Sequence, residues 1–253
     1  MTKRQILCAG KTQAARYAAA SLSQFGLPVT WEPSEAVGHL LLDIPSFEAS
    51  GCLRMGGSPE ELLTHLPNDI TVYGGNLAGR IPENLRVVDF LQDEEYLAKN
   101  AYLTAECALD VALPWLPISL HRCPVLIIGW GRIGKCLSQL LRNLGAAVSV
   151  AARKASDRAI LSAMGFHGMD PAFLAESLGH YRLIFNTVPS ILLTREDMAR
   201  CQEDCIRIDL ASAPGMDDPD AIIARGLPGV HLPESSGKLI AETFLKHYRE
   251  ESL

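Results

Sequence analysis

The chain has 253 residues, of which 48% are hydrophobic and 21% charged, so it can bury one large core or two cores of about 100–150 residues each. A formal net charge of −6 gives no general attraction to polyanions, which argues against nucleic acid or an anionic membrane surface as the main partner. No apolar run approaches the about 18 residues that a membrane span needs, and the N-terminus lacks a secretion signal. We expect a cytoplasmic protein with a small ligand.

Short apolar runs alternate with amphipathic ones in the first half of the chain. The runs that predict strands are Ile6–Ala9, Val29–Trp31, Leu40–Asp43, Ile70–Tyr73 and Val87–Phe90. Helices are expected between them at Lys11–Phe25 and Glu60–Leu66. Strand and helix in repetition are typical of a parallel sheet. Residues 1–118 are therefore predicted to form a flavodoxin-like α/β domain for substrate or partner binding.

A long stretch without glycine or proline, from Asp93 to about Leu113, opens with acidic residues that suit a helix N-terminus. Pro114 and Pro117 should end this helix, and a fresh strand is expected after Pro124. We place the connection between two domains here, so that residues 119–253 form the second one.

The second half predicts a Rossmann order of elements. Strands are expected at Val125–Ile128, Val148–Ala152, near Phe166, at Arg182–Asn186 and at Cys205–Asp209. A helix is expected after the first of these strands, up to about Leu144. Further helices are expected at Asp157–Met164, Ala172–Leu178, Glu196–Cys201, Pro219–Arg225 and Ser236–Tyr248. The predicted fold class is thus α/β with two doubly wound parallel-sheet domains, the C-terminal one a dinucleotide-binding Rossmann domain. Its last helix can pack back on the first domain.

A glycine fingerprint stands directly after the first strand of the second half and opens a helix, which is the context that gives this motif its specificity. The motif is Gly129-Trp130-Gly131-Arg132-Ile133-Gly134. The first glycine permits a tight turn, the second lets backbone approach a pyrophosphate, and the third lets the helix pack close to the strand. The pyrophosphate would then lie at a helix N-terminus.

The next strand ends in Ala151-Ala152-Arg153-Lys154, where an NAD enzyme usually carries an acid for the ribose hydroxyls. An acid would repel the 2′-phosphate of NADP, whereas Arg153 can donate two hydrogen bonds to it and Lys154 can add a point charge. We therefore predict NADP as the cofactor. The alternative is a solvated basic pair at a strand end.

Two later strands end in loops of small and polar residues that should face the cofactor. They are Asn186-Thr187-Val188-Pro189-Ser190 and the Asp209–Gly215 loop, in which Ala211 is the second candidate beside Asp209. Both strand ends lie on the ligand-binding edge of a doubly wound sheet. The alternative for both loops is ordinary turn chemistry.

Seven cysteines are scattered without a Cys-x-x-Cys pair, and their odd number in a chain without a secretion signal predicts free thiols. Cys201 and Cys205 lie four residues apart, but no histidine is placed to complete a tetrahedral ligand set. We therefore expect no metal site.

With these segments the chain resembles the family formed by the A subunits of dipicolinate synthase. The resemblance is strongest over residues 89–217, in DFLQDEEYLAKNAYLTAE, VLIIGWGRIGKCLSQLLRNLGAAVSVAARK, IFNTVPSILL and IDLASAPG. It implies a two-domain dehydrogenase fold and NADP-linked oxidation of a dihydrodipicolinate-type cyclic dicarboxylate. It also implies a flavoprotein-like partner, the B subunit of the synthase, and a role in spore formation. We further expect a homodimer.

The linking helix supplies the catalytic candidates. Glu106 is a candidate general base, and Asn100 and Thr104, four residues apart on one face, are candidates to orient the substrate. The alternative for Glu106 is a surface helix acid. Lys238 can pair with a substrate carboxylate or be a solvated lysine.

Two other functions stay open. A D-2-hydroxyacid dehydrogenase shares the two-domain plan, and His231 lies roughly where its catalytic histidine would fall, but the loop after Asp209 lacks the arginine that activates the carbonyl. The second open function is that of a non-catalytic NADP-binding protein, since a cofactor site does not prove turnover.

Overall fold

The computed structural model describes residues 4–251 and divides into two compact units. Unit 1 runs to Asn100 and resumes at Pro228, and unit 2 is Ala101–Leu227. The division therefore falls within helix α3 (Glu94–Ala112), whereas the sequence predicts it at residues 118 and 119. Among residues 4–251, no helix has both the length and the apolar composition to span a membrane.

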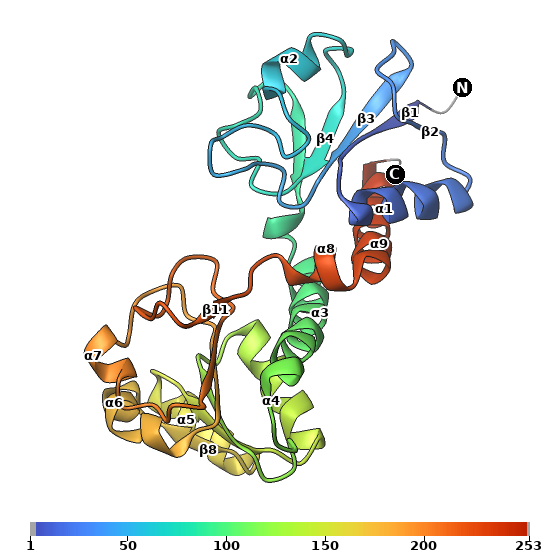
Figure 1. The fold of residues 1–253 in the computed structure, drawn as a ribbon. Helices are drawn as coiled ribbons and strands as arrows, with labels where there is room; N and C mark the ends of the chain where they lie inside the picture. The colour runs from blue at the N-terminus through green and yellow to red at the C-terminus, as the bar shows by residue number, and fades with distance from the viewer. Residues whose placement is uncertain (1–3, 252–253) are drawn as a thin grey trace. The chain divides into compact units, whose positions relative to one another are not determined.

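Unit 1 is built on a five-stranded parallel sheet in the order β2-β1-β3-β4-β5 (Figure 1). The strands are β1 (Gln5–Ala9), β2 (Val29–Thr30), β3 (Val37–Leu42), β4 (Thr71–Gly74) and β5 (Arg86–Asp89). Its helical segments are α1 (Gln13–Gln24), α2 (Pro59–Leu63), η1 (Phe90–Gln92), the start of α3, α8 (Leu227–His231) and α9 (Pro233–Glu251). This strand order is that of flavodoxin-like doubly wound sheets.

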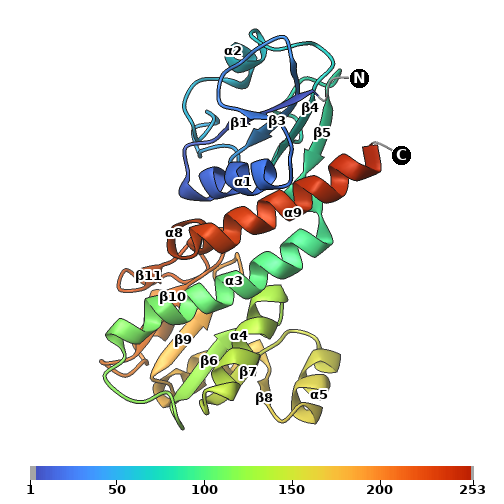
Figure 2. The ribbon, with the colours of Figure 1, turned by 90° about the vertical axis from the view of Figure 1, so that its right-hand side faces the viewer.

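The last helix belongs to unit 1, where α9 runs beside α1 (Figure 2). Gly237 makes this close approach possible: a Cβ atom there would lie 2.6 Å from the Ala14 carbonyl oxygen and 2.8 Å from the Ala18 amide nitrogen. A larger residue at this position would push the two backbones apart.

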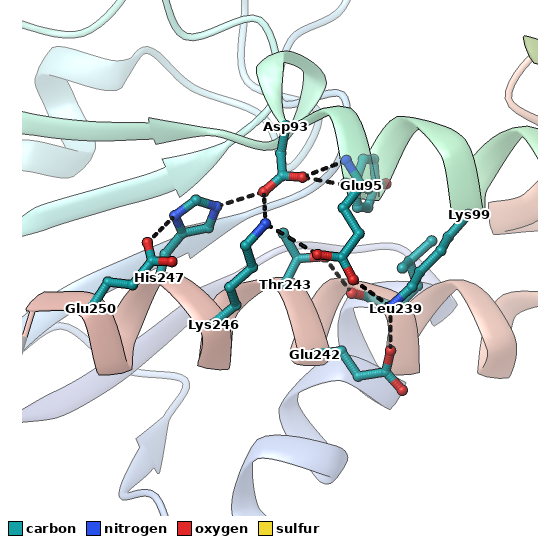
Figure 3. A network of polar contacts seen from close by, with 10 residues as sticks. Asp93, Glu95, Lys99, Leu239, Glu242, Thr243, Lys246, His247 and Glu250 are labelled. Atoms are coloured by element: carbon teal, nitrogen blue, oxygen red, sulfur yellow. Dashed lines mark hydrogen bonds and ion pairs between the residues drawn. The ribbon is translucent and has the colours of Figure 1, made fainter.

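A polar network joins α9 to the start of α3 within unit 1 (Figure 3). The Asp93 carboxylate, only 7% exposed, accepts hydrogen bonds from the Glu95 and Tyr96 amides at 2.9 and 3.0 Å and so caps α3. It also accepts from Lys246 Nζ at 3.0 Å and from His247 Nε2 at 2.8 Å. Burial alone would raise the pKa of Asp93, but these donors outweigh it and hold the pKa well below its usual range.

The stability that Asp93 supplies should depend on pH. Because its native pKa is lowered, its stabilisation is fully present above the unfolded pKa of about 3.9 and is lost as the pH falls toward the native pKa. Asn at this position keeps a capping oxygen but loses the charge. We expect Asp93→Asn to lower the free energy of unfolding by about 1–2 kcal/mol near neutral pH, discounted for the exposure of Lys246. The difference should shrink below about pH 4 in urea titrations. A difference that is independent of pH would contradict this account.

Unit 2 holds a six-stranded parallel sheet in the order β11-β10-β9-β6-β7-β8. Its strands are β6 (Pro124–Ile128), β7 (Ala147–Ala151), β8 (His167–Met169), β9 (Leu183–Asn186), β10 (Ile206–Asp209) and β11 (Ile222–Ile223). Its helices, besides the end of α3, are η2 (Leu113–Trp115), α4 (Arg132–Asn143), α5 (Ala155–Ala163), η3 (Pro171–Phe173), α6 (Leu174–Ser177), η4 (Leu178–His180) and α7 (Arg195–Met198). This is the Rossmann order, and the predicted fold class of two doubly wound parallel-sheet domains is confirmed.

The helix predicted at Pro219–Arg225 is wrong, because this segment contains the edge strand β11 instead. Arg207 on β10 forms an ion pair with Asp218, and the Asp220 amide donates to Asp218 Oδ1 at 3.0 Å. These contacts fix a turn just before two β-branched residues, which then pair with β10.

Candidate functional site

The glycine turn joins β6 to α4 as the fingerprint predicts. Gly129 has φ +109°, a conformation that favours glycine, and a Cβ atom on it would collide with Thr187. A Cβ atom on Gly134 would collide with the Gly129 carbonyl oxygen, so this glycine lets α4 pack against the turn. Nothing lies within 4 Å of the Cβ position of Gly131. The turn is therefore tight on two sides and open on the third, where a ligand can approach the backbone.

Gly131 is also the N-cap of α4, and no side chain caps this helix end. The first amide groups of any α-helix point away from the helix and favour an anion at its N-terminus. The neighbouring loop is tied to the turn, since the amide and hydroxyl of Thr187 both donate to the Ile128 carbonyl at 2.9 Å. A phosphate group fits this end of α4.

A pocket of about 370 Å³ opens beside the glycine turn. Its lining residues are Ile128, Gly129, Trp130, Ala151, Arg153, Lys154, Asp157, Pro171, Val188, Ser190 and Leu192. Apolar walls with a few polar groups are typical of small-molecule and cofactor sites. Of the predicted residues, the pocket brings together Gly129 and Trp130 of the turn, Arg153 and Lys154 after β7, and Val188 and Ser190 of the loop after β9.

Arg153 and Lys154 both line this pocket and are exposed. Neither side chain has a hydrogen-bond or ion-pair partner within the part of the chain that the structure describes. Two cations without partners among residues 4–251, at the end of the second strand of a Rossmann-type sheet, have the charge and the donors to bind a phosphate.

Asp157, which the sequence motifs do not single out, lines the same pocket from the first turn of α5 and is half-buried. Its negative charge disfavours binding of a phosphate in the pocket. Because Asp157 stands in the first turn of the helix after β7, its place near the cofactor site could have been predicted from the sequence. Ser190, which ends the predicted loop after β9, and Leu192, which lies beyond it, also line the pocket.

Asn186 and Asp209 are both fully buried and hold the two later loops together. Asn186 Nδ2 donates to Asp209 Oδ1 at 2.8 Å and to the Val188 carbonyl at 3.0 Å. The Asp209 carboxylate also accepts from the amides of Ala211 and Gly215, at 3.1 and 2.9 Å. These two side chains thus shape the loops, and Val188 is the residue of this set that lines the pocket. Pro189 is exposed, and Ala211 is buried.

Arg225 was not predicted either, and it follows β11 on the same edge of the sheet. Its Nε donates to the Ala211 carbonyl at 2.9 Å, which fixes the guanidinium beside the Asp209 loop. The side chain is exposed and has no ion-pair partner among residues 4–251. It leaves two nitrogen atoms for an anion.

The catalytic candidates on α3 do not form one cluster. Thr104 is buried, Asn100 is half-buried and Glu106 is exposed. Residues two positions apart on an α-helix are separated by an angle of about 200° around the helix axis, so Glu106 and Thr104 lie on different faces. Lys238 is exposed, and its Nζ forms an ion pair with Glu234 Oε1 at 2.7 Å. This agrees with the alternative that Lys238 is a solvated lysine. His231 ends α8.

All seven cysteines are free thiols in the structure. Cys201 is half-buried and Cys205 is buried. Within residues 4–251, no group of three or more His, Cys, Asp or Glu side chains is arranged to hold a metal ion.

The chain is similar to the A subunit of dipicolinate synthase, although no family model matches it. It is 24% identical to the Bacillus subtilis (strain 168) protein of that name over 234 residues, which are 85% of this chain and 78% of that protein. The crystal structure from Bacillus halodurans gives a TM-score of 0.81 at 22% identity, over 96% of this chain and 97% of that one. The Bacillus subtilis crystal structure gives 0.83 at 19% identity, over 99% and 97%.

The same fold occurs in a dehydrogenase. A structure of L-alanine dehydrogenase gives a TM-score of 0.68 at 14% identity, over 94% of this chain and 79% of that one. The chain therefore has the two-domain fold found in dehydrogenases and a glycine turn suited to a dinucleotide. It is similar to the A subunit of dipicolinate synthase in both sequence and fold, so the resemblance predicted from its motifs is confirmed.

Proposed function

We propose that this chain is an NADP-dependent oxidoreductase that oxidises a dihydrodipicolinate-type cyclic dicarboxylate by hydride transfer. The observation that carries the cofactor choice is the pair of unpaired cations, Arg153 and Lys154, in the pocket beside the glycine turn. The similarity to the A subunit of dipicolinate synthase supports the reaction and the substrate class. The name of that protein also supports a second component, which we propose as a flavoprotein-like partner. A homodimer and a cytoplasmic role in spore formation belong to the same proposal.

NADP, when bound, would supply the hydride acceptor. The glycine turn and the start of α4 would bind its pyrophosphate, and Val188 would form part of the wall. Oxidation of the dihydropyridine-type ring removes one hydride and one proton, and aromatisation drives it. Arg225 is suited to a substrate carboxylate, because its Nε is fixed and its remaining N–H groups can donate as a fork. Asn100, Thr104 and Glu106 remain the proposed orienting and proton-accepting residues.

The test of this function is substrate-dependent NADPH production by the purified chain, with and without a flavoprotein-like partner. NADPH formed from the cyclic dihydro-dicarboxylate supports the proposal. NADPH formed only from a D-2-hydroxy acid would favour the hydroxyacid dehydrogenase instead, and cofactor binding without turnover of either compound would favour a non-catalytic protein. Full activity of the chain alone would remove the partner from the proposal.

Glu106→Gln should lower kcat on the order of 100-fold while leaving the dissociation constant of NADP unchanged, if Glu106 accepts the proton. Gln keeps the size of the side chain but cannot take a proton at neutral pH. Steady-state kinetics together with NADP titration would measure both effects. Glu94→Gln, at another exposed acid on α3, is the matched control and should leave kcat unchanged. Normal turnover of the Glu106 variant would make this residue structural.

A further inference from the structure

A guanidinium group outside the pocket holds the turn that carries the two cations. Arg158 lies on α5 and is not among the residues that line the pocket. Its Nη1 donates to the carbonyl oxygens of Ala152 and Arg153, both at 2.8 Å. Arg158 therefore bridges two consecutive carbonyls of the backbone between β7 and α5.

The other end of the guanidinium forms an ion pair with Asp170, with Nη2 and Oδ2 2.8 Å apart. Asp170 follows β8, and its Oδ1 accepts from the Ala172 amide at 3.0 Å, which caps η3. Pro171, the first residue of η3, lines the pocket. One ion pair thus connects two walls of the pocket, the turn with the cations and the start of η3.

The pair is placed where it can matter energetically. The side chains of Arg158 and Asp170 are 24% and 38% exposed, so solvent screens them less than it screens a fully exposed pair. The Ala152 amide also ties the turn to β8, since it donates to the Met169 carbonyl at 3.1 Å, whereas Lys154, the N-cap of α5, makes no side-chain capping bond. Since neither cation has a partner among residues 4–251, the backbone that carries them sets where their charges lie.

We propose that Arg158 and Asp170 are a positioning pair that sets the selectivity of the pocket for NADP over NAD. Arg158 acts through the Ala152 and Arg153 carbonyls and not by touching the cofactor. This inference rests on the proposed NADP function. Loss of the pair lets the two cations move away from the 2′-phosphate while the glycine turn, which binds the pyrophosphate shared by both cofactors, stays in place.

The experiment measures dissociation constants of NADP and NAD by titration calorimetry for four proteins. They are the unmodified chain, Arg158→Gln, Arg158→Lys and the control Arg142→Gln. Arg142 is matched because it also lies in unit 2, donates to a main-chain carbonyl, that of Met164, and bonds to Gln139, yet it does not line the pocket. Arg158→Gln should weaken NADP about fivefold to twentyfold and NAD less than about twofold.

The NADP affinity of Arg158→Lys should lie between those of the unmodified chain and Arg158→Gln. A lysine ammonium can reach one carbonyl but cannot bridge two carbonyls and Asp170 together. The control variant should keep the ratio of the two dissociation constants. In each protein, an unchanged affinity for NAD indicates that the glycine turn is intact. If Arg158→Gln does not fold, Asp170→Asn tests the ratio instead, because Asn keeps an oxygen to cap η3 but removes the charge that pairs with Arg158.

Three outcomes would overturn the inference. If the unmodified chain binds both cofactors equally, the proposed NADP function fails and the inference fails with it. If the unmodified chain prefers NADP and Arg158→Gln keeps that preference, the positioning role alone is lost. If Arg158→Gln and Arg142→Gln weaken both cofactors alike, Arg158 is a structural residue.

Discussion

Arg153→Ala should remove most of the preference for NADP, which we expect to be about 10–100-fold over NAD in the unmodified chain. The reason is that Arg153 lines the pocket, forms no ion pair within the described part of the chain and can donate two hydrogen bonds to a 2′-phosphate. A charge-assisted contact of this kind contributes about 1.5–3 kcal/mol, and about 1.4 kcal/mol corresponds to a tenfold change in affinity. Titration calorimetry with both cofactors measures the ratio directly.

A substitution in the same pocket that removes a negative charge should have the opposite effect on NADP affinity. Asp157 places a carboxylate near the two cations, so Asp157→Asn should tighten NADP by about twofold to fivefold while changing NAD little. Added salt should also reduce the preference for NADP, because part of it is a screened interaction between exposed charges. Equal dissociation constants for NAD and NADP in the unmodified chain would refute the assignment.

The glycine turn and the two cations that line the pocket could be predicted because both depend on local sequence. A strand, a Gly-x-Gly-x-x-Gly run and a helix determine a tight turn with an open side, and the structure shows that side at Gly131. The residues that follow the second strand lie on the ligand-binding edge of a sheet of this order, so Arg153, the second residue after β7, could be assigned to the pocket from its position alone.

Contacts between distant segments could not be predicted in the same way. Arg158 and Asp170 come from different elements, and nothing in either segment tells that their side chains meet. Asp209 was expected to face the cofactor because it ends a strand, but its carboxylate is fully buried against Asn186 and loop amides. Position at a strand end identifies the edge of the sheet, whereas the direction of a side chain depends on packing.

The last helix shows how tertiary packing accommodates a residue of low helix propensity. The sequence predicts this helix at Ser236–Tyr248. In the structure α9 begins at Pro233, and Gly237 lies inside it against α1. The absence of a side chain at Gly237 lowers helix propensity but lets the two helices approach, and the packing outweighs the local cost.

Asp209→Ala should be the most destabilising single change in unit 2 among those considered, lowering its free energy of unfolding by about 3–5 kcal/mol. The substitution leaves three donors without their acceptor: Asn186 Nδ2 and the amides of Ala211 and Gly215. Gly215 lies so close to Asn186 that a Cβ atom there would collide with its amide nitrogen, so the loops have no room to rearrange around the lost carboxylate. Buried donors without partners are costly because water cannot replace the missing acceptor.

Cofactor affinity should fall with stability, because the Asn186 loop carries Val188 on the pocket wall. Urea unfolding followed by tryptophan fluorescence suits the measurement, since Trp115 and Trp130 both lie in unit 2. The matched control is Asp220→Ala, whose side chain is 79% exposed and 3.5 Å from Arg207, and it should cost less than about 0.5 kcal/mol. If Asp209→Ala proves no more destabilising than this control, the buried carboxylate does not hold the two loops together, and the rigidity of the pocket wall must come from the apolar packing beneath it.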